Sequence, residues 1–145
     1  MTVDFNIMAG GEAGQGVQSV GMILAKTMAR GGLHIFADQD YESRVRGGHN
    51  FFRIRVSDSK VLALSEKLDI LVALNNETVD LHAGELKGDG IIIYDGEQTK
   101  VEAKGNKYFN VPLTRLAEDT VQIKLMSNMV AAGAVIGLAG CDFDL

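Results

Sequence analysis

The N-terminal part of the chain carries the clearest pattern of apolar and polar positions. An apolar run over residues 3–9 ends at a glycine-dense turn, residues 10–16, and a helical pattern follows over residues 17–30. A second short apolar stretch, residues 33–37, ends at Asp38. The order strand, glycine-rich turn, helix and strand is typical of nucleotide-type sites in parallel α/β proteins.

The middle of the chain predicts a β-hairpin. Residues 51–56 alternate apolar with mostly basic side chains, as a strand with one buried face does. A polar turn at 57–60 separates this strand from a second apolar run, 61–64, which we expect to return antiparallel. The sheet is therefore expected to be mixed, with most of its strands parallel.

The remaining pattern alternates buried strands with helices. The expected elements are strand 68–74, helix 79–86 capped by Asn76, strand 91–95, strand 107–111, a helix starting at Pro112, and helix 125–140 capped by Ser127 or Asn128. The last helix is apolar on nearly every side, so we expect it to be buried, in part against another chain. Together the pattern predicts one domain over residues 1–145. Its fold class is α/β: a three-layer α/β/α Rossmann-like domain with a mixed, mostly parallel sheet and a β-hairpin.

Composition and charge exclude several classes of protein. The chain has 145 residues, enough for one domain with its own core, and a net charge of −5, which argues against nucleic-acid binding. No apolar stretch is long enough to span a bilayer, and no basic region precedes the first apolar run as in a signal peptide. The single cysteine, Cys141, excludes an internal disulfide and any cysteine-held metal or iron–sulfur cluster built by this chain alone. We therefore expect a cytoplasmic protein that binds neither nucleic acid nor membrane.

The glycine turn is the first candidate binding site. Its candidate residues are Gly11, Gly14, Gln15 and Gly16. The glycines allow positive φ and close approach to the backbone, and free N–H groups at the start of the following helix favour an anion. The spacing matches two of the three glycines of a dinucleotide fingerprint, with Ser19 in the third place, and Asp38 stands where a ribose-binding acid would follow. Tight packing of the helix on the sheet explains the same glycines, so both interpretations stay open.

A second candidate site follows the second expected strand. Its residues are Arg44, Arg46, Gly47, Gly48, His49 and Asn50. Loops after strand C-termini carry the ligands of open α/β sheets, arginines offer bidentate donors to phosphate or carboxylate, and glycines expose backbone N–H groups. A solvated surface loop is the alternative. No recognisable motif places a nucleophile beside His49, and one histidine cannot define a metal site, so we assign no catalytic residue and no metal ligand.

The two glycine motifs at this separation resemble those of a known family. The residues that carry the resemblance are 10–16, 41–50, 53–58, 69–75 and 127–129. They are similar to the gamma subunit, or gamma domain, of the 2-oxoacid:ferredoxin (acceptor) oxidoreductases. The form of residues 41–44 is similar to versions in which this domain is fused ahead of the thiamine-pyrophosphate-binding alpha domain, often in 2-oxoglutarate enzymes. The family domain usually runs some tens of residues past Leu145, so we expect a C-terminal truncation.

The resemblance implies a role inside a larger enzyme. Such complexes oxidatively decarboxylate a 2-oxoacid, such as 2-oxoglutarate or pyruvate, with coenzyme A (CoA) to give acyl-CoA, CO2 and reduced ferredoxin. Thiamine diphosphate, Mg and iron–sulfur clusters are implied in companion domains and none in this chain. The implied partners are an alpha subunit on the thiamine pyrimidine side, a beta subunit on the pyrophosphate side, and ferredoxin through the complex.

The expected contribution of this chain is assembly, with a wall of the CoA site. Either the glycine turn or residues 44–50 would meet a CoA phosphate or a neighbouring subunit. The isolated chain is expected to be inactive and to function in an oligomer. A free-standing nucleotide-binding domain and a regulatory module without ligand are the alternatives, and the substrate contacts that select one 2-oxoacid are expected to lie elsewhere.

Overall fold

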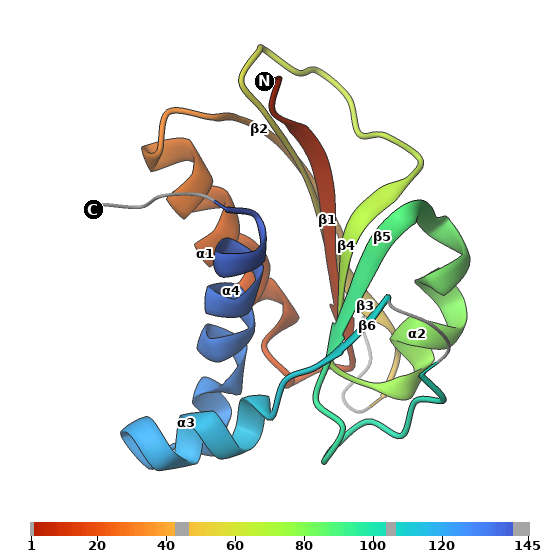
Figure 1. The fold of residues 1–145 in the computed structure, drawn as a ribbon, viewed down its shortest axis with the longest axis vertical. Helices are drawn as coiled ribbons and strands as arrows, with labels where there is room; N and C mark the ends of the chain where they lie inside the picture. Colours follow the sequence, from red (N-terminus) through yellow and green to blue (C-terminus); the bar gives the residue numbers. More distant parts are fainter. Residues whose placement is uncertain (1, 43–46, 104–106, 141–145) are drawn as a thin grey trace.

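A twisted six-stranded sheet forms the centre of the molecule (Figure 1). The computed structural model describes residues 2–42, 47–103 and 107–140. The strands are β1 (Asp4–Gly11), β2 (His34–Asp40), β3 (Asn50–Ser57), β4 (Leu68–Ala73), β5 (Leu86–Tyr94) and β6 (Tyr108–Asn110). The helices are α1 (Val17–Arg30), α2 (Asn76–His82), α3 (Leu113–Val121) and α4 (Ser127–Leu138), with 3₁₀ turns η1 (Ala83–Glu85) and η2 (Lys124–Met126).

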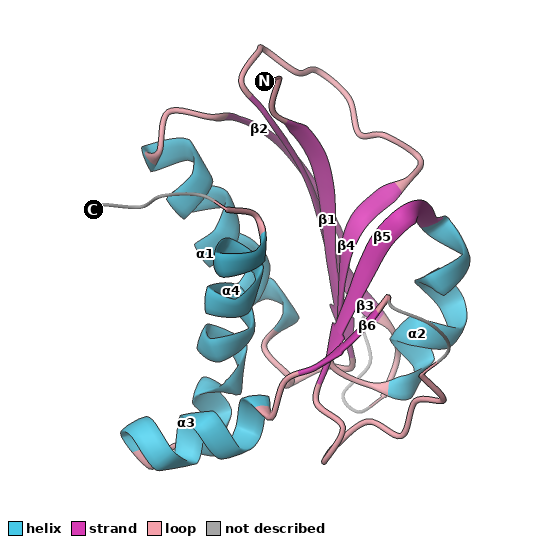
Figure 2. Cartoon of the chain, in the orientation of Figure 1, coloured by secondary structure: helices cyan, strands magenta, loops and turns pink. Residues whose placement is uncertain are grey.

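The sheet is mixed and mostly parallel, as predicted. Its strand order is β2-β3-β1-β4-β5-β6. Strands β1, β4, β5 and β6 pair in parallel, whereas β3 is antiparallel to both of its neighbours. Helices α1, α3 and α4 lie on one face of the sheet and α2 on the other (Figure 2). The three-layer α/β/α fold class is therefore confirmed.

The predicted hairpin between residues 51–56 and 61–64 is wrong. Strand β3 pairs with β1 from Asn50 to Ser57, and with β2 over nearly the same length. Both hydrogen-bonding edges of β3 are therefore occupied, and no edge is left for residues 61–64, which form no strand. The two consecutive strands that pair antiparallel are instead β2 and β3.

Several element boundaries differ from the predictions. Helix α2 begins at Asn76 and its N-cap is Asn75, whose Oδ1 accepts from the backbone N–H of Thr78 at 3.0 Å. Leu86, expected at the end of this helix, begins β5, where it pairs with Leu68. At the last helix, the N-cap position is Met126, so neither of the two predicted caps holds.

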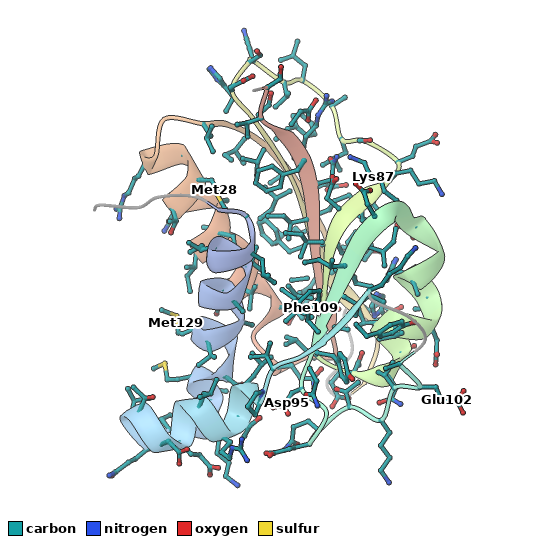
Figure 3. All side chains as sticks on the ribbon, viewed as in Figure 1. Met28, Lys87, Asp95, Glu102, Phe109 and Met129 are labelled. Carbon is teal, nitrogen blue, oxygen red and sulfur yellow. The ribbon has the colours of Figure 1, made fainter. Side chains whose placement is uncertain are left out.

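The hydrophobic core lies on both faces of the sheet. The α1 stripe of Val17, Val20, Leu24 and Met28 is buried in one cluster with Phe52, Ile54 and Val56 of β3. A second cluster under α2 contains Met8, Leu71, Val79 and Ile92. Helix α4 buries Ala131, Ala132 and Val135 and leaves Met129 pointing away from the sheet (Figure 3). In the described part of the chain, no helix has the length and hydropathy needed to cross a membrane.

Candidate functional site

The glycine turn between β1 and α1 is held in shape by one of its own side chains. Gly14 and Gly16 have φ values of 91° and 82°, a region that favours glycine. Gln15 Oε1 accepts from the backbone N–H of Glu12 at 2.8 Å, and Gln15 Nε2 donates to the carbonyl of Leu74 at 3.0 Å. Gln15 therefore ties the turn both to itself and to the end of β4.

The glycines of the turn serve different purposes. A Cβ added at Gly10 would lie 2.5 Å from Thr78, one at Gly11 would lie 2.7 Å from Gln15 Oε1, and one at Gly16 would lie 2.6 Å from Asn128 Nδ2. A Cβ at Gly14 would meet nothing within 4 Å. The packing interpretation thus applies to Gly10, Gly11 and Gly16, whereas Gly14 faces open space.

A cleft of about 300 Å³ opens beside the turn. Its walls come from the turn and the first turn of α1, from the facing ends of β2 and β3, and from the region around the start of α4. Gly14, Gly16, Asn50 and Asn128 all line it. The structure therefore brings the predicted glycine turn together with Asn50, and adds a residue from the far end of the chain.

Asn128 is the functional candidate that the sequence analysis missed. Asn128 is 9% exposed, and its buried Oδ1 has no hydrogen-bond partner among the described residues. A buried polar atom without a partner is costly, so each one needs a physical explanation, such as a catalytic role or a bound water or ion. The sequence offered two signals: an asparagine at the start of an apolar helix, which was interpreted as a cap, and the family resemblance of residues 127–129.

The second candidate site lies partly outside the described residues. Arg44 and Arg46 are not described, so the proposed arginine clamp stays a prediction. Gly47 and Gly48 have φ values of 73° and 85°, as expected of glycines that re-aim the backbone. Asn50 is buried, and its Oδ1 accepts from the backbone N–H of Glu42 at 2.8 Å.

His49 packs against α2 and does not line the cleft. Its Nε2 lies 2.7 Å from Nε2 of His82, a residue on α2. Burial, followed by the proximity of His82, lowers the pKa of His49. His49 therefore lies on the α2 side beside Gly10 and away from the cleft, whereas Asn50, predicted in the same candidate site, lines it.

The arrangement differs from a dinucleotide site at Asp38. Strand β3 lies between β1 and β2, so Asp38 is two strands away from the turn, roughly 10 Å at the usual strand spacing. In a dinucleotide fold the acid ends the strand next to β1. Asp38 is exposed here and its Oδ1 accepts from the N–H of Gln39, so the alternative of a free-standing dinucleotide-binding domain is not favoured.

A second opening lies at the carboxyl ends of β4 and β5. It has a volume of about 310 Å³ and is lined in part by Gln15, Asp95 and Lys124. Asp95 lies where β5 turns toward α3 (Figure 3), and its two oxygens accept from the backbone N–H groups of Glu97 and Thr114. Because both oxygens brace the chain, Asp95 serves the fold.

The described residues contain no group of three or more histidine, cysteine, aspartate or glutamate side chains that could hold a metal ion. The only cysteine of the sequence, Cys141, lies outside the described residues. The donor set of these residues therefore does not fit a bound metal or an iron–sulfur cluster.

A mixed α/β sheet with a glycine turn and a cleft at its β1–α1 connection defines a Rossmann-like domain. The chain belongs to the pyruvate ferredoxin/flavodoxin oxidoreductase family, whose model matches residues 6–145. The gamma-type domain expected from the two motifs is confirmed by the relatives.

The relatives are of two lengths. The chain is 32% identical over 143 residues to the 2-oxoglutarate synthase subunit KorC of Methanothermobacter marburgensis, covering 92% of this chain and 77% of that one. It is 35% identical over 96 residues to the alpha subunit of a Sulfolobus 2-oxoacid:ferredoxin oxidoreductase, covering 65% of this chain but 15% of that subunit. The chain thus matches most of one kind of relative and a small part of the other.

Two solved structures share the fold. The keto/oxoacid ferredoxin oxidoreductase gamma subunit from Geobacter sulfurreducens has a TM-score of 0.81 and 26% identity, and covers 95% of this chain and 77% of that one. The 2-oxoglutarate:ferredoxin oxidoreductase from Magnetococcus marinus, with 2-oxoglutarate, coenzyme A and succinyl-CoA bound, has a TM-score of 0.82 and 26% identity. It is matched over 93% of this chain and 24% of its own.

Proposed function

We propose that this chain is the gamma-type module of a thiamine-dependent 2-oxoacid:ferredoxin oxidoreductase and that its glycine-turn cleft holds part of coenzyme A. The complex would convert a 2-oxoacid, CoA and oxidised ferredoxin to acyl-CoA, CO2 and reduced ferredoxin. Family membership and the similarity to a KorC subunit and to a gamma subunit support this role. The names of these relatives favour 2-oxoglutarate as the 2-oxoacid.

The observation that carries the CoA proposal is the free Oδ1 of Asn128 in the cleft. This atom needs a donor, and CoA offers hydroxyl, amide and amino donors along its length. The backbone of Gly14 and the start of α1 favour a phosphate at the same place, because the first N–H groups of a helix lack partners within it. A neutral acceptor beside a turn that favours phosphate fits a ligand that carries both hydrogen-bond donors and phosphates, as CoA does.

The negative charge of the described cleft lining bears on the role proposed for Arg44 and Arg46. The described lining includes the carboxylates of Glu12 and Asp40 and no lysine or arginine. A phosphorylated ligand would be repelled by these carboxylates unless cations neutralise it. We assign that role to Arg44 and Arg46, which follow β2 closely in the sequence.

The reactive groups of the complex belong to companion chains under this proposal. Thiamine diphosphate, Mg and iron–sulfur clusters would be held by the alpha and beta subunits or domains and by their electron-transfer partners, with ferredoxin reached through the complex. Apolar side chains exposed on α3, η2 and α4, and on the link between α3 and η2, support an assembly role; they include Leu116, Val121, Ile123, Leu125, Met126 and Met129. A place in the cytoplasm and an oligomeric state stay predictions.

Substitution of Asn128 tests the proposed function in the assembled enzyme. Asn128→Ala should raise KM for CoA about tenfold, because a lost hydrogen bond to a neutral group is worth roughly 1 to 1.5 kcal/mol. The KM for the 2-oxoacid and kcat should stay near their wild-type values, since the cleft contacts only CoA.

Glu66→Ala is the control, because Glu66 is exposed between β3 and β4 and does not line the cleft. It should leave all three kinetic constants unchanged. An unchanged KM for CoA in Asn128→Ala would contradict the proposal, and so would a rise in KM for both substrates.

A further inference from the structure

A chain of polar side chains joins β3 to α2 and η1, on the face of the sheet opposite α1. His49 Nε2 and His82 Nε2 are 2.7 Å apart, and His82 Nδ1 lies 2.8 Å from Glu85 Oε1. The other oxygen of Glu85 accepts from Arg53 Nη2 at 2.8 Å. His82 is 7% exposed. None of these residues lines the glycine-turn cleft, so the network is separate from the proposed CoA site.

Glu85 fixes where the ring protons lie. A carboxylate accepts only, so His82 Nδ1 carries a proton and donates it to Glu85, which leaves His82 Nε2 as an acceptor. His49 must then donate from its own Nε2, and a neutral His49 has no proton on Nδ1. That Nδ1 is buried and has no hydrogen-bond partner in the part of the chain that the structure describes. These proton positions are assigned from the hydrogen-bond network. While both rings are neutral, only this arrangement satisfies both contacts of His82.

We propose that His49 and His82 form an acid-sensitive clamp, which fastens the start of β3 to α2 while both rings are neutral. A proton added at His49 Nδ1 creates a buried, charged N–H without an acceptor. A further proton at His82 Nε2 sets one N–H against another across the 2.7 Å contact. The first proton therefore costs a buried N–H without an acceptor, the second removes the acceptor from the contact, and the two rings separate.

The charged groups around the pair act in both directions. The carboxylates of Glu77, Glu42 and Asp40 favour protonation of His49, whereas burial and His82 oppose it. Arg53 pairs with Glu85 on the far side of His82. Burial is the largest influence, and the net effect is a pKa of His49 below its ordinary value of 6.5.

The sign of the pH dependence follows from that direction. The unfolded chain takes up a proton at His49 at a higher pH than the folded chain does. The stability that the clamp contributes is therefore complete above pH 6.5 and is lost as the pH falls from 6.5 toward the lower folded pKa.

Nitrogen-15 NMR of the histidine rings in the full chain tests the clamp. The sequence holds three histidines, so His34, which is exposed on β2, serves as an internal reference. At neutral pH the spectrum should show the proton of His82 on Nδ1 and that of His49 on Nε2. In His82→Gln the titration of His49 should move to higher pH, because the repulsion from His82 is removed. His34→Gln should leave it unchanged.

Urea unfolding of the same variants between about pH 5 and 8 gives a second readout. Wild type and His34→Gln should lose stability in parallel below pH 6.5, and His82→Gln should lose less over that range. A proton on Nε2 of His82 at neutral pH would overturn the proposal, and this is read from the wild-type chain even where a variant fails to fold. Identical His49 titrations in wild type and His82→Gln would also overturn it.

Discussion

At the scale of single residues, the surroundings of a helical glycine decide whether a larger residue fits in its place. Gly21 lies inside α1 and is buried against β3, where an added Cβ would collide with the ring of Phe52. Gly133 lies inside α4 and is exposed, and a Cβ there would meet nothing within 4 Å. Both positions have ordinary helical backbone, so the two glycines differ in what surrounds them and not in conformation.

Alanine at these two glycines should therefore have opposite effects on stability. Gly133→Ala should raise the free energy of unfolding by up to about 1 kcal/mol, because alanine is the better helix former. Gly21→Ala gains the same propensity but forces Phe52 or α1 to move, and a net loss of roughly 1 to 3 kcal/mol is expected. Urea denaturation of the two variants beside wild type measures both, and a change of the same sign in both would contradict the packing argument.

Some residues of the candidate site could be predicted from the sequence, and others could not. Gly14 and Gly16 were identified because glycine spacing is visible in the sequence, and both adopt positive φ as expected. His49 was assigned with residues 44–50 to the second candidate site, but alternation along the start of β3 turns it to the α2 face. Asn128 was missed as a site residue because only tertiary structure brings α4 beside the glycine turn.

At the scale of elements, β3 and α2 set the geometry around the glycine turn. Strand β3 separates β2 from β1, and this moves the end of β2 away from the place it has in a dinucleotide fold. Helix α2 has seven residues and depends on its cap, because a short helix has little cooperativity of its own. Asn75 supplies that cap: its Oδ1 accepts from both the N–H and the Oγ1 of Thr78.

Removal of this cap should destabilise the domain. Asn75→Ala is expected to lower the free energy of unfolding by about 1 kcal/mol, a typical loss for a helix N-cap. Asn75→Asp retains an acceptor oxygen and should keep most of the stability. Chemical denaturation compares the two variants, and equal losses in both would show that the cap is not the source of the effect.

Elements with a strong pattern were predicted well, and elements decided by strand pairing were not. The extent of α1 and the positions of β1, β3 and β4 follow directly from periodicity and glycine punctuation. The hairpin prediction failed because residues 61–64 are apolar and follow a turn, while their exclusion depends on β1 and β2 occupying both edges of β3. Pairing between distant segments leaves no local signal, so a single sequence could not reveal it.

At the scale of the whole molecule, the two faces of the sheet have different roles. The face with α1, α3 and α4 carries the cleft and the exposed apolar side chains of α3 and α4, which supports its proposed roles in CoA binding and assembly. The face with α2 carries the histidine clamp and the smaller core. These roles make the chain, as proposed, a binding and docking module whose chemistry lies on companion subunits.

The central claim is that CoA lies against the glycine turn, and a structure of the assembled complex with CoA bound tests it most directly. A CoA phosphate should lie within hydrogen-bond distance of the backbone N–H groups at Gly14 to Val17, and a CoA donor should reach Asn128 Oδ1. A side chain of a companion subunit filling this cleft, with CoA bound elsewhere, would contradict the claim.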